Sequence, residues 1–266
     1  MVINRPPTVM TIAGSDSGGG AGIQADLKTF PALGVFGTST LTAITAQNTI
    51  AVSAVHEIPT DIITAQIDAV LTDIGADAVK TGMLSSTAII EAVAEAVQRH
   101  RVPILVVDPV MVAKSGDRLL RQEAIGAMRS VLLPLATVVT PNIPEAEELT
   151  GITVANDADA RRVAQAIVDM GASSVVVKGG HRDGPPTDLF FDGDEFHEFT
   201  TKRIPTVNTH GTGCTFASAI ASYLAHGEPV AIAISRAKDY VTEAIRASYS
   251  IGSGHGPLHH FYAFWK

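Results

Sequence analysis

The feature that most constrains the fold is an alternation of short apolar strands with amphipathic helices along almost the whole chain. Pro103–Val107 is fully apolar and is closed by Asp108-Pro109, whereas Asp61–Leu71 carries its apolar residues at helical spacing. Strands that are apolar on both faces are typical of a parallel sheet covered by helices. We therefore expect an α/β fold with a mostly parallel central sheet and helices on both faces.

The expected elements follow one another without a low-complexity linker, an internal repeat or a break in composition. The expected strands are Thr8–Ala13, Ala51–Ile58, Asp77–Lys80, Pro103–Val107, Thr137–Thr140 and Ser174–Lys178, followed by a hairpin of Thr187–Phe191 with Glu195–Thr200. The expected helices are Gly20–Leu33, Asp61–Leu71, a segment around Ile89–Val97, Ala158–Met170, Thr212–His226 and Pro229–Ser248. We expect a single domain over residues 1–266.

Composition excludes several classes of protein. With 46% hydrophobic and 17% charged residues the chain is globular. Its formal net charge of −8 argues against a nucleic-acid partner, which would need a basic face. The single cysteine cannot form an intramolecular disulfide and suits a reducing compartment. No run approaches the roughly 18 apolar residues of a membrane span, and the N-terminus is too polar for a signal peptide, so we expect a cytoplasmic protein with no membrane partner.

The segment Gly211-Thr212-Gly213-Cys214 opens an apolar helix. Glycines there leave backbone N–H groups uncovered, and the helix dipole adds partial positive charge, so the turn is suited to phosphate or to developing oxyanion charge. Cys214 stands where the same groups favour its thiolate over its thiol. The alternative is an ordinary glycine-capped loop entering a buried helix, because a lone G-x-G pattern is a weak signal.

Small, polar or charged residues follow most of the apolar strands. Ligands of parallel sheets bind beyond the carboxyl ends of the strands, so these residues predict one site along one rim. Familiar nucleotide motifs are missing, since no Gly-Lys dipeptide forms a Walker A loop and Gly18, Gly20 and Gly22 do not complete a dinucleotide fingerprint. Asp16 is interpreted as a turn residue. The rim segments are Gly14–Ser17, Thr81–Met83, Asp108–Val110, Pro141–Asn142 and Gly179–His181.

Seven segments, spread over nearly the whole chain, carry a resemblance to a known family. They are Ala13–Asp26, Thr45–Thr49, Lys80–Leu84, Asp108–Met111, Thr140–Ala146, Val177–His181 and His210–Cys214. On these segments the chain resembles the bacterial hydroxymethylpyrimidine/phosphomethylpyrimidine kinases of thiamine biosynthesis, within the ribokinase-like superfamily. The resemblance implies a single lidless ribokinase-like domain, ATP and Mg²⁺ as cosubstrates, and commonly a homodimer. It also implies two successive phosphorylations, of an aminopyrimidine alcohol and then of its monophosphate.

The catalytic roles that the resemblance implies fall on Gly211–Cys214, which we call the second glycine segment; the first is Gly18–Gly22. Kinase chemistry needs groups that position the acceptor, neutralise the triphosphate and support proton removal. The backbone of Gly211, Thr212 and Gly213 would hold charge on the transferred phosphoryl group. Cys214 would stand beside the acceptor hydroxyl as its base, where related kinases usually carry Asp. A thiol with an ordinary pKa of about 8.5 needs lowering for that role, and the alternative is a buried cysteine without chemistry.

The substrate roles fall on the first half of the chain. Gln47 is expected to read the pyrimidine, because one amide offers an acceptor and two donors in one plane and can pair with an aminopyrimidine edge. Met83 and Val110 would contact the ring. Ala21 would leave room for it, and Asp26 would anchor the ligand loop. The alternatives are a solvent-facing Gln47 and a Met83 that only fills the core.

The remaining site residues are assigned to the nucleotide and its metal ion. Lys178 ends an apolar strand before two glycines, which argues against an ordinary surface lysine, whereas Lys238 is as compatible with a surface charge. Asp108 and Glu145 are expected to hold Mg²⁺ through water, since this ion keeps much of its hydration shell. The alternative for Glu145 is a helix cap, because acids are favoured in a first helical turn. The expected ATP-binding residues are Asn142, Lys178, His181 and Lys238.

Two other functions stay open on the sequence. A pyridoxal kinase is a related activity, but pyridoxal has no amine beside its ring nitrogen, so Gln47 would lose half of its pairing. A non-catalytic sensor on the kinase fold is the other. Four intact features argue against it together: Asp108, Glu145, Lys178 and Gly211–Cys214. The C-terminal tail concentrates Phe261, Tyr262, Phe264 and Trp265, which predicts that it docks on the body or on a second subunit.

Overall fold

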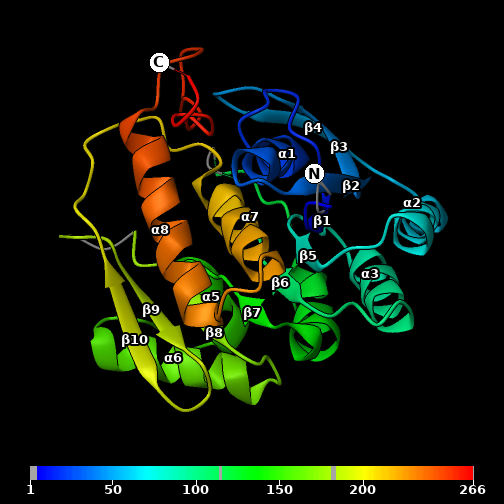
Figure 1. Cartoon of the computed structure of the whole chain (residues 1–266). Coiled ribbons are helices and arrows are strands. Elements are labelled where there is room, and N and C mark those ends of the chain that lie inside the picture. Colours follow the sequence, from blue (N-terminus) through cyan, green and yellow to red (C-terminus); the bar gives the residue numbers. More distant parts are fainter. Residues whose placement is uncertain (1–4, 114–115, 181–183, 266) are drawn as a thin grey trace.

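The computed structural model describes residues 5–113, 116–180 and 184–265 and has an α/β architecture (Figure 1). Strands alternate with helices along most of the chain, as the apolar periodicity predicts. The strands are β1 (Thr8–Ala13), β2 (Phe36–Leu41), β3 (Ala43–Gln47), β4 (Val52–Glu57), β5 (Ala78–Thr81), β6 (Leu105–Val107), β7 (Val138–Val139), β8 (Val175–Val177), β9 (Thr187–Phe191) and β10 (Phe196–Thr200). The helices are α1 (Gly22–Ala32), α2 (Thr60–Asp73), α3 (Thr87–Arg99), α4 (Ile125–Ala127), α5 (Ile143–Thr150), α6 (Asp157–Asp169), α7 (Thr212–Ala225) and α8 (Val230–Arg246).

Among the described residues, eight strands form one sheet in the order β10-β9-β8-β7-β6-β5-β1-β2. Neighbours from β2 to β8 run parallel. Strands β9 and β10 form an antiparallel hairpin on the β8 edge. The predicted mostly parallel sheet and its terminal hairpin are therefore confirmed.

Helices cover both faces of the sheet, because the central strands are apolar on both sides. Val107 and Val139 face a core formed with α2, α3, α5 and α6. Val106 and Val138, one residue earlier on the same strands, face a second core formed with α1, α7 and α8 (Figure 1). In the part of the chain described, no helix is both long and apolar enough to cross a membrane.

Some elements depart from the expectation. Strand β2 lies at the sheet edge and keeps most of its residues partly exposed, so its sequence shows no continuous apolar run. Strand β3 pairs with β4 in a separate two-stranded sheet, with a register irregularity between Ala46 and Gln47. Residues 122–135 form short 3₁₀, α and π turns. These pieces are too short to show a periodic signal, which needs a window of roughly 11 residues or more.

Candidate active site

A cavity of about 640 Å³ lies at the carboxyl ends of the parallel strands, where the sequence predicts the rim segments. Its walls include residues that follow β1, β5, β6, β7 and β8, together with the start of α7 and one side of α8. Asp26 does not line this cavity, and His181 lies outside the described residues. The other predicted site residues all line it: Ala21, Gln47, Met83, Asp108, Val110, Asn142, Glu145, Lys178, Gly211, Thr212, Gly213, Cys214 and Lys238.

The two glycine segments pack directly against each other on one wall of the cavity. Gly211 has a φ of +81°, and a side chain there would place its Cβ 1.8 Å from the carbonyl oxygen of Gly20. A Cβ on Gly20 would stand 2.4 Å from the ring of His210. Both positions therefore require glycine. This contact fixes the loop before α1 against the start of α7.

Asp16 and His210 hold the contact together. Asp16 accepts hydrogen bonds from the backbone N–H groups of Gly18, Gly20 and Ala21, at 2.8, 3.0 and 2.8 Å. Its Oδ2 also lies 2.8 Å from Nε2 of His210. Burial raises the pKa of Asp16, but the hydrogen bonds from His210 and the backbone outweigh burial, so the pKa lies below its ordinary value. The interpretation of Asp16 as a turn residue is confirmed, and His210 is a partner that no sequence pattern indicated.

The first turn of α7 supplies backbone donors to the cavity. The helix contains no acceptor for the N–H groups of Gly213 and Cys214, because a first turn precedes any intrahelical partner. No acidic side chain occupies this turn, which lies wholly within the described residues. Thr212 contributes less than expected, since its N–H and its hydroxyl both donate to the carbonyl of Thr209, at 3.3 and 2.7 Å. An anion here would meet Gly213, Cys214 and the helix dipole.

Cys214 is partly buried on the cavity wall. Burial raises the pKa of its thiol to about 11, and the carboxylates of Asp26 and Asp108 act in the same direction. The Lys80 ammonium and the N–H of Gly22 oppose this shift without cancelling it. The expectation that the helix N-terminus favours the thiolate is therefore wrong for the free protein, because desolvation outweighs the nearby positive charge. The thiol is protonated at neutral pH.

Asp26 lies beneath the cavity rather than in it. Its side chain is fully buried with that of Lys80, and the two form an ion pair at 2.9 Å. Its carboxylate also accepts the hydroxyls of Ser218 and Thr11, each at 2.6 Å. Asp26, grouped with the substrate residues as an anchor of the ligand loop, is therefore no direct substrate contact, since protein donors already occupy its oxygens. Asp26 instead ties α1, α7, β1 and β5 together below the two glycine segments.

Lys80 is a charged residue that the sequence reading passed over. Burial lowers its pKa, but the Asp26 carboxylate and other nearby anions outweigh burial and raise the pKa above its ordinary value. The ammonium is therefore retained inside the protein. The available signal was a lysine inside a short strand that is buried throughout, because lysine is almost never fully buried unless it is paired.

Asp108 and Lys178 form an ion pair on the cavity wall, with Nζ 3.0 Å from Oδ1. Thr140 donates its hydroxyl to the same oxygen at 3.1 Å. A Cβ on Gly213 would stand 3.3 Å from Nζ of Lys178 and 3.6 Å from Oδ2 of Asp108. The pair thus lies against the backbone turn that is predicted to hold the phosphoryl group. Burial lowers the pKa of Lys178, but Asp108 and Glu145 outweigh burial and raise it, so this lysine stays charged.

Glu145 and Asn142 form a capping box at the start of α5. Oε2 of Glu145 accepts the N–H of Asn142 at 2.8 Å, and Oδ1 of Asn142 accepts the N–H of Glu145 at 2.9 Å. The helix-cap alternative for Glu145 is therefore confirmed. The backbone of Met111 also hydrogen-bonds to the Glu145 carboxyl. Burial raises the pKa of Glu145 to about 7, with Asp108 adding to the shift and Lys178 opposing it.

Lys238, which is predicted to bind ATP, lines the cavity from α8. It is 9% exposed, and its Nζ is 2.7 Å from Oδ2 of Asp188. Asp188 in turn accepts the N–H of Gly179 at 2.9 Å. Lys238 is thus no surface charge, because Asp188 holds it against the cavity wall. Asp188 was missed, since a single Asp inside a hairpin strand gives no signal of its own.

Gln47, Met83, Val110 and Ala21 line the same cavity as the Cys214 turn. Gln47 is half-buried. Its backbone N–H donates to the Ser17 hydroxyl at 2.8 Å, and its Oε1 accepts the Thr45 hydroxyl at 3.2 Å. Gln47 thus lines the cavity, and its contact with the pyrimidine stays a prediction. Met83 is 8% exposed, so it lines the cavity and fills the core at once.

Comparisons with known proteins agree with this geometry. A family profile described as phosphomethylpyrimidine kinase matches residues 16–259. A hydroxymethylpyrimidine/phosphomethylpyrimidine kinase from Rhizobium meliloti is 54% identical over 97% of this chain and 98% of its own length. A thiamine biosynthesis bifunctional protein from Geobacter sulfurreducens is 53% identical over 96% of this chain, which spans only 52% of that longer protein.

Solved structures give the same fold. The pyridoxal kinase from Staphylococcus aureus, in complex with AMP-PCP and pyridoxal, superposes with a TM-score of 0.89 at 39% identity, covering 97% of this chain and 95% of that one. The ribokinase-like fold is therefore shown. From the profile match and the near-complete coverage of its relatives, this chain belongs to the phosphomethylpyrimidine kinase family.

Proposed function

We propose that this protein transfers the γ-phosphoryl group of ATP to the hydroxyl of 4-amino-5-hydroxymethyl-2-methylpyrimidine and then phosphorylates the resulting monophosphate. The observation that carries the proposal is a single cavity lined by an amide that fits an aminopyrimidine edge and by a helix turn that fits a phosphoryl group. Family membership supports a kinase, and the AMP-PCP complex of the related pyridoxal kinase supports ATP as donor.

The roles follow from the positions. Gln47 would orient the pyrimidine, with Met83 and Val110 against its ring. The N–H groups of Gly213 and Cys214 would stabilise charge on the transferred phosphoryl group, as preorganised donors do in other enzymes. Lys178 and Lys238, each held by a carboxylate, would neutralise the phosphates of the nucleotide.

Cys214 lines the cavity where it could take the proton of the acceptor hydroxyl. Its thiol must first lose a proton that burial holds firmly. In a loose phosphoryl-transfer transition state the hydroxyl proton leaves late, so positioning and charge neutralisation supply most of the catalysis. We therefore assign most of the catalysis to positioning and charge neutralisation, and give Cys214 a base role only through the small fraction of its thiol that is already ionised at neutral pH.

A Mg²⁺ ion fits the acidic part of the cavity. Among the described residues, no group of three or more His, Cys, Asp or Glu side chains could cage a metal ion by itself. Mg²⁺ is commonly held by one or two carboxylates together with phosphates and water, and the neighbouring Asp108 and Glu145 carboxyls provide that set. The ion would supply charge neutralisation on the nucleotide phosphates.

A homodimer and a cytoplasmic location belong to the same proposal. The tail docks on the body through Tyr262, whose ring centroid lies 5.7 Å from that of Tyr240. Phe264 remains 65% exposed, and Ile44 on β3 is 48% exposed. Such exposed apolar side chains support a contact with a second subunit, which light scattering of the purified protein would test.

Product analysis tests the proposed reaction. The pyrimidine alcohol is incubated with Mg²⁺ and ATP, and mass spectrometry follows the appearance of the monophosphate and then the diphosphate. Both products are expected, and the diphosphate should also form when the monophosphate is supplied alone. Phosphate transfer to pyridoxal only would refute the pyrimidine assignment and favour the pyridoxal kinase, which the structural likeness keeps as the second candidate.

A further inference from the structure

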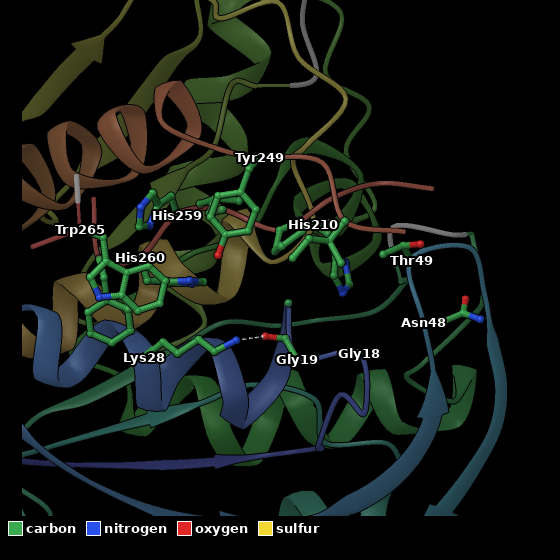
Figure 2. A pocket seen from close by; sticks show the side chains of 15 residues that line it. Gly18, Gly19, Lys28, Asn48, Thr49, His210, Tyr249, His259, His260 and Trp265 are labelled. Carbon is green, nitrogen blue, oxygen red and sulfur yellow. Dashed lines mark hydrogen bonds between the residues drawn. The ribbon is translucent and has the colours of Figure 1, made fainter. Parts of the chain in front are cut away.

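A second, smaller cavity of about 150 Å³ is lined in part by Gly18, Gly19 and Gly20 (Figure 2). Its walls are the Gly18–Gly20 loop, the turn after β3 and the C-terminal tail. His210 lines both this pocket and the large cavity. The proposed kinase reaction makes no use of this pocket.

The charge of the pocket is opposite to that of the whole protein. Lys28 is the one formally charged side chain among its described lining residues, and no carboxylate joins it, although the chain has a net charge of −8. The Lys28 ammonium donates to the carbonyl of Gly19 at 2.6 Å, and its remaining protons can serve a ligand (Figure 2). Burial is the main cause that lowers the pKa of His260 to about 4, and the neighbouring Lys28 and His259 add to the shift. These features fit an anion.

Aromatic rings form the other side of the pocket. The ring of His259 lies between those of Tyr249 and Trp265, with centroid separations of 5.2 and 5.3 Å (Figure 2). Nδ1 of His259 is buried and has no hydrogen-bond partner within the described part of the chain. A cavity of about 150 Å³ in another protein accommodates benzene. The pocket therefore has room for one flat ring of about the size of benzene.

We propose that this pocket is a second ligand site, which binds a small phosphate-bearing molecule with its phosphate at Lys28 and a flat ring against His259 and Trp265. The site is coupled to the large cavity through the chain itself. Gly20, Asn48 and His210 line the pocket, and the residues next to them in sequence, Ala21, Gln47 and Gly211, line the large cavity. A ligand bound in the small pocket is therefore expected to shift the residues that are proposed to hold the pyrimidine in the large cavity.

Trp265 makes the proposal directly measurable, because it is the single tryptophan of the chain and it lines this pocket. Inorganic phosphate and phenyl phosphate are titrated separately at constant ionic strength, and the intrinsic fluorescence is followed. A saturable change is expected with both. Phenyl phosphate is expected to bind about 3- to 10-fold more tightly than inorganic phosphate, because its ring adds contacts in the pocket. Equal binding of the two would overturn the proposed ring contact.

Matched lysine variants locate the response. Lys28→Met should weaken binding at least about tenfold, as loss of a charged hydrogen-bond donor does, and Lys28→Arg should retain the response. Lys178→Met serves as the control, since it removes a lysine from the large cavity and should leave the fluorescence response unchanged. A response that persists in Lys28→Met, or that sodium chloride reproduces, would overturn the proposal. Melting curves of each variant confirm that the folded protein is compared.

A kinetic measurement tests the coupling and rests on the proposed function. The KM for the pyrimidine alcohol should shift severalfold when phenyl phosphate saturates the wild-type pocket, and this shift should vanish in Lys28→Met. An unchanged KM in the wild type would overturn the coupling. The fluorescence titration needs no enzymatic activity, so failure of the kinase assignment and failure of the second site are told apart.

Discussion

The protonation state of Cys214 can be measured without knowing the substrate. The pKa of its thiol is raised from 9.0 to about 11. At pH 7 roughly one thiol in 10⁴ is then ionised, against about one in 10² for an unshifted thiol. Because the thiolate is the species that reacts, iodoacetamide should modify the folded protein about a hundredfold more slowly than the unfolded chain at this pH.

The assay is specific because the chain contains one cysteine. Mass spectrometry follows the mass gain over time, at pH values from 7 to 10, for the native protein and for the protein in urea. The native rate should rise about tenfold for each pH unit across the whole range, whereas the rate in urea should level off near pH 9. Steric shielding would slow the native reaction without moving its midpoint, so the midpoint decides. A native midpoint below pH 8 would refute the account of burial.

Three further predictions concern other residues. Gln47→Leu keeps the approximate volume but leaves polar atoms of the pyrimidine ring unpaired. Calorimetry should show pyrimidine binding weakened by about 1–3 kcal/mol, roughly 5- to 150-fold, and nucleotide binding unchanged. Equal weakening of both ligands would show a structural role for Gln47. Lys80→Met leaves the buried Asp26 carboxylate without its counter-ion and should lower the free energy of unfolding in urea by about 3–5 kcal/mol. The double variant Lys80→Met/Asp26→Asn should recover part of that loss, and a loss below about 1 kcal/mol in the single variant would contradict the buried pair. Glu145 gains a proton as pH falls through about 7, so Mg²⁺ should bind more weakly at pH 6 than at pH 8 when ADP is present. Glu145→Gln should remove this difference. An identical pH dependence in the variant would exclude Glu145 from the metal site.

The sheet and its helices could be predicted because apolar periodicity is a local property. Strands such as β6 and helices such as α3 bury whole runs or whole faces, and their residues show it. Strand β2 could not be found in this way, because an edge position leaves it partly exposed. Strand β3 alternates buried and exposed residues over only five positions, which is too short a pattern to separate from a loop.

The part of the candidate site that is formed by residues directly after the parallel strands could be predicted from the sequence. The rim segments after parallel strands meet in one cavity, as topology requires. Pairings between distant residues could not be predicted: Asp26 with Lys80, Asp188 with Lys238, and Asp16 with His210, which are 194 positions apart. The pKa of Cys214 was misjudged for the same reason, since burial depends on the packed surroundings and not on the helix start alone.

The base role of Cys214 has its own kinetic test. If the sulfur takes up the hydroxyl proton, Cys214→Ser should lower single-turnover rates at least about a hundredfold while substrate binding and the melting temperature stay near the parent values. Cys214→Asp should restore part of the rate. Full activity of Cys214→Ser would leave the Gly213 and Cys214 backbone donors, with the cations of the site, as the main source of catalysis.

The central claim is that this cavity selects an aminopyrimidine alcohol for phosphoryl transfer. The most direct test is the ratio of kcat/KM for the pyrimidine alcohol to kcat/KM for pyridoxal, measured in one ATP-coupled assay. Pyridoxal has no amine beside its ring nitrogen and so loses one of the two hydrogen bonds that Gln47 could make. The ratio should therefore favour the pyrimidine by about tenfold or more. A ratio that favours pyridoxal would contradict the account.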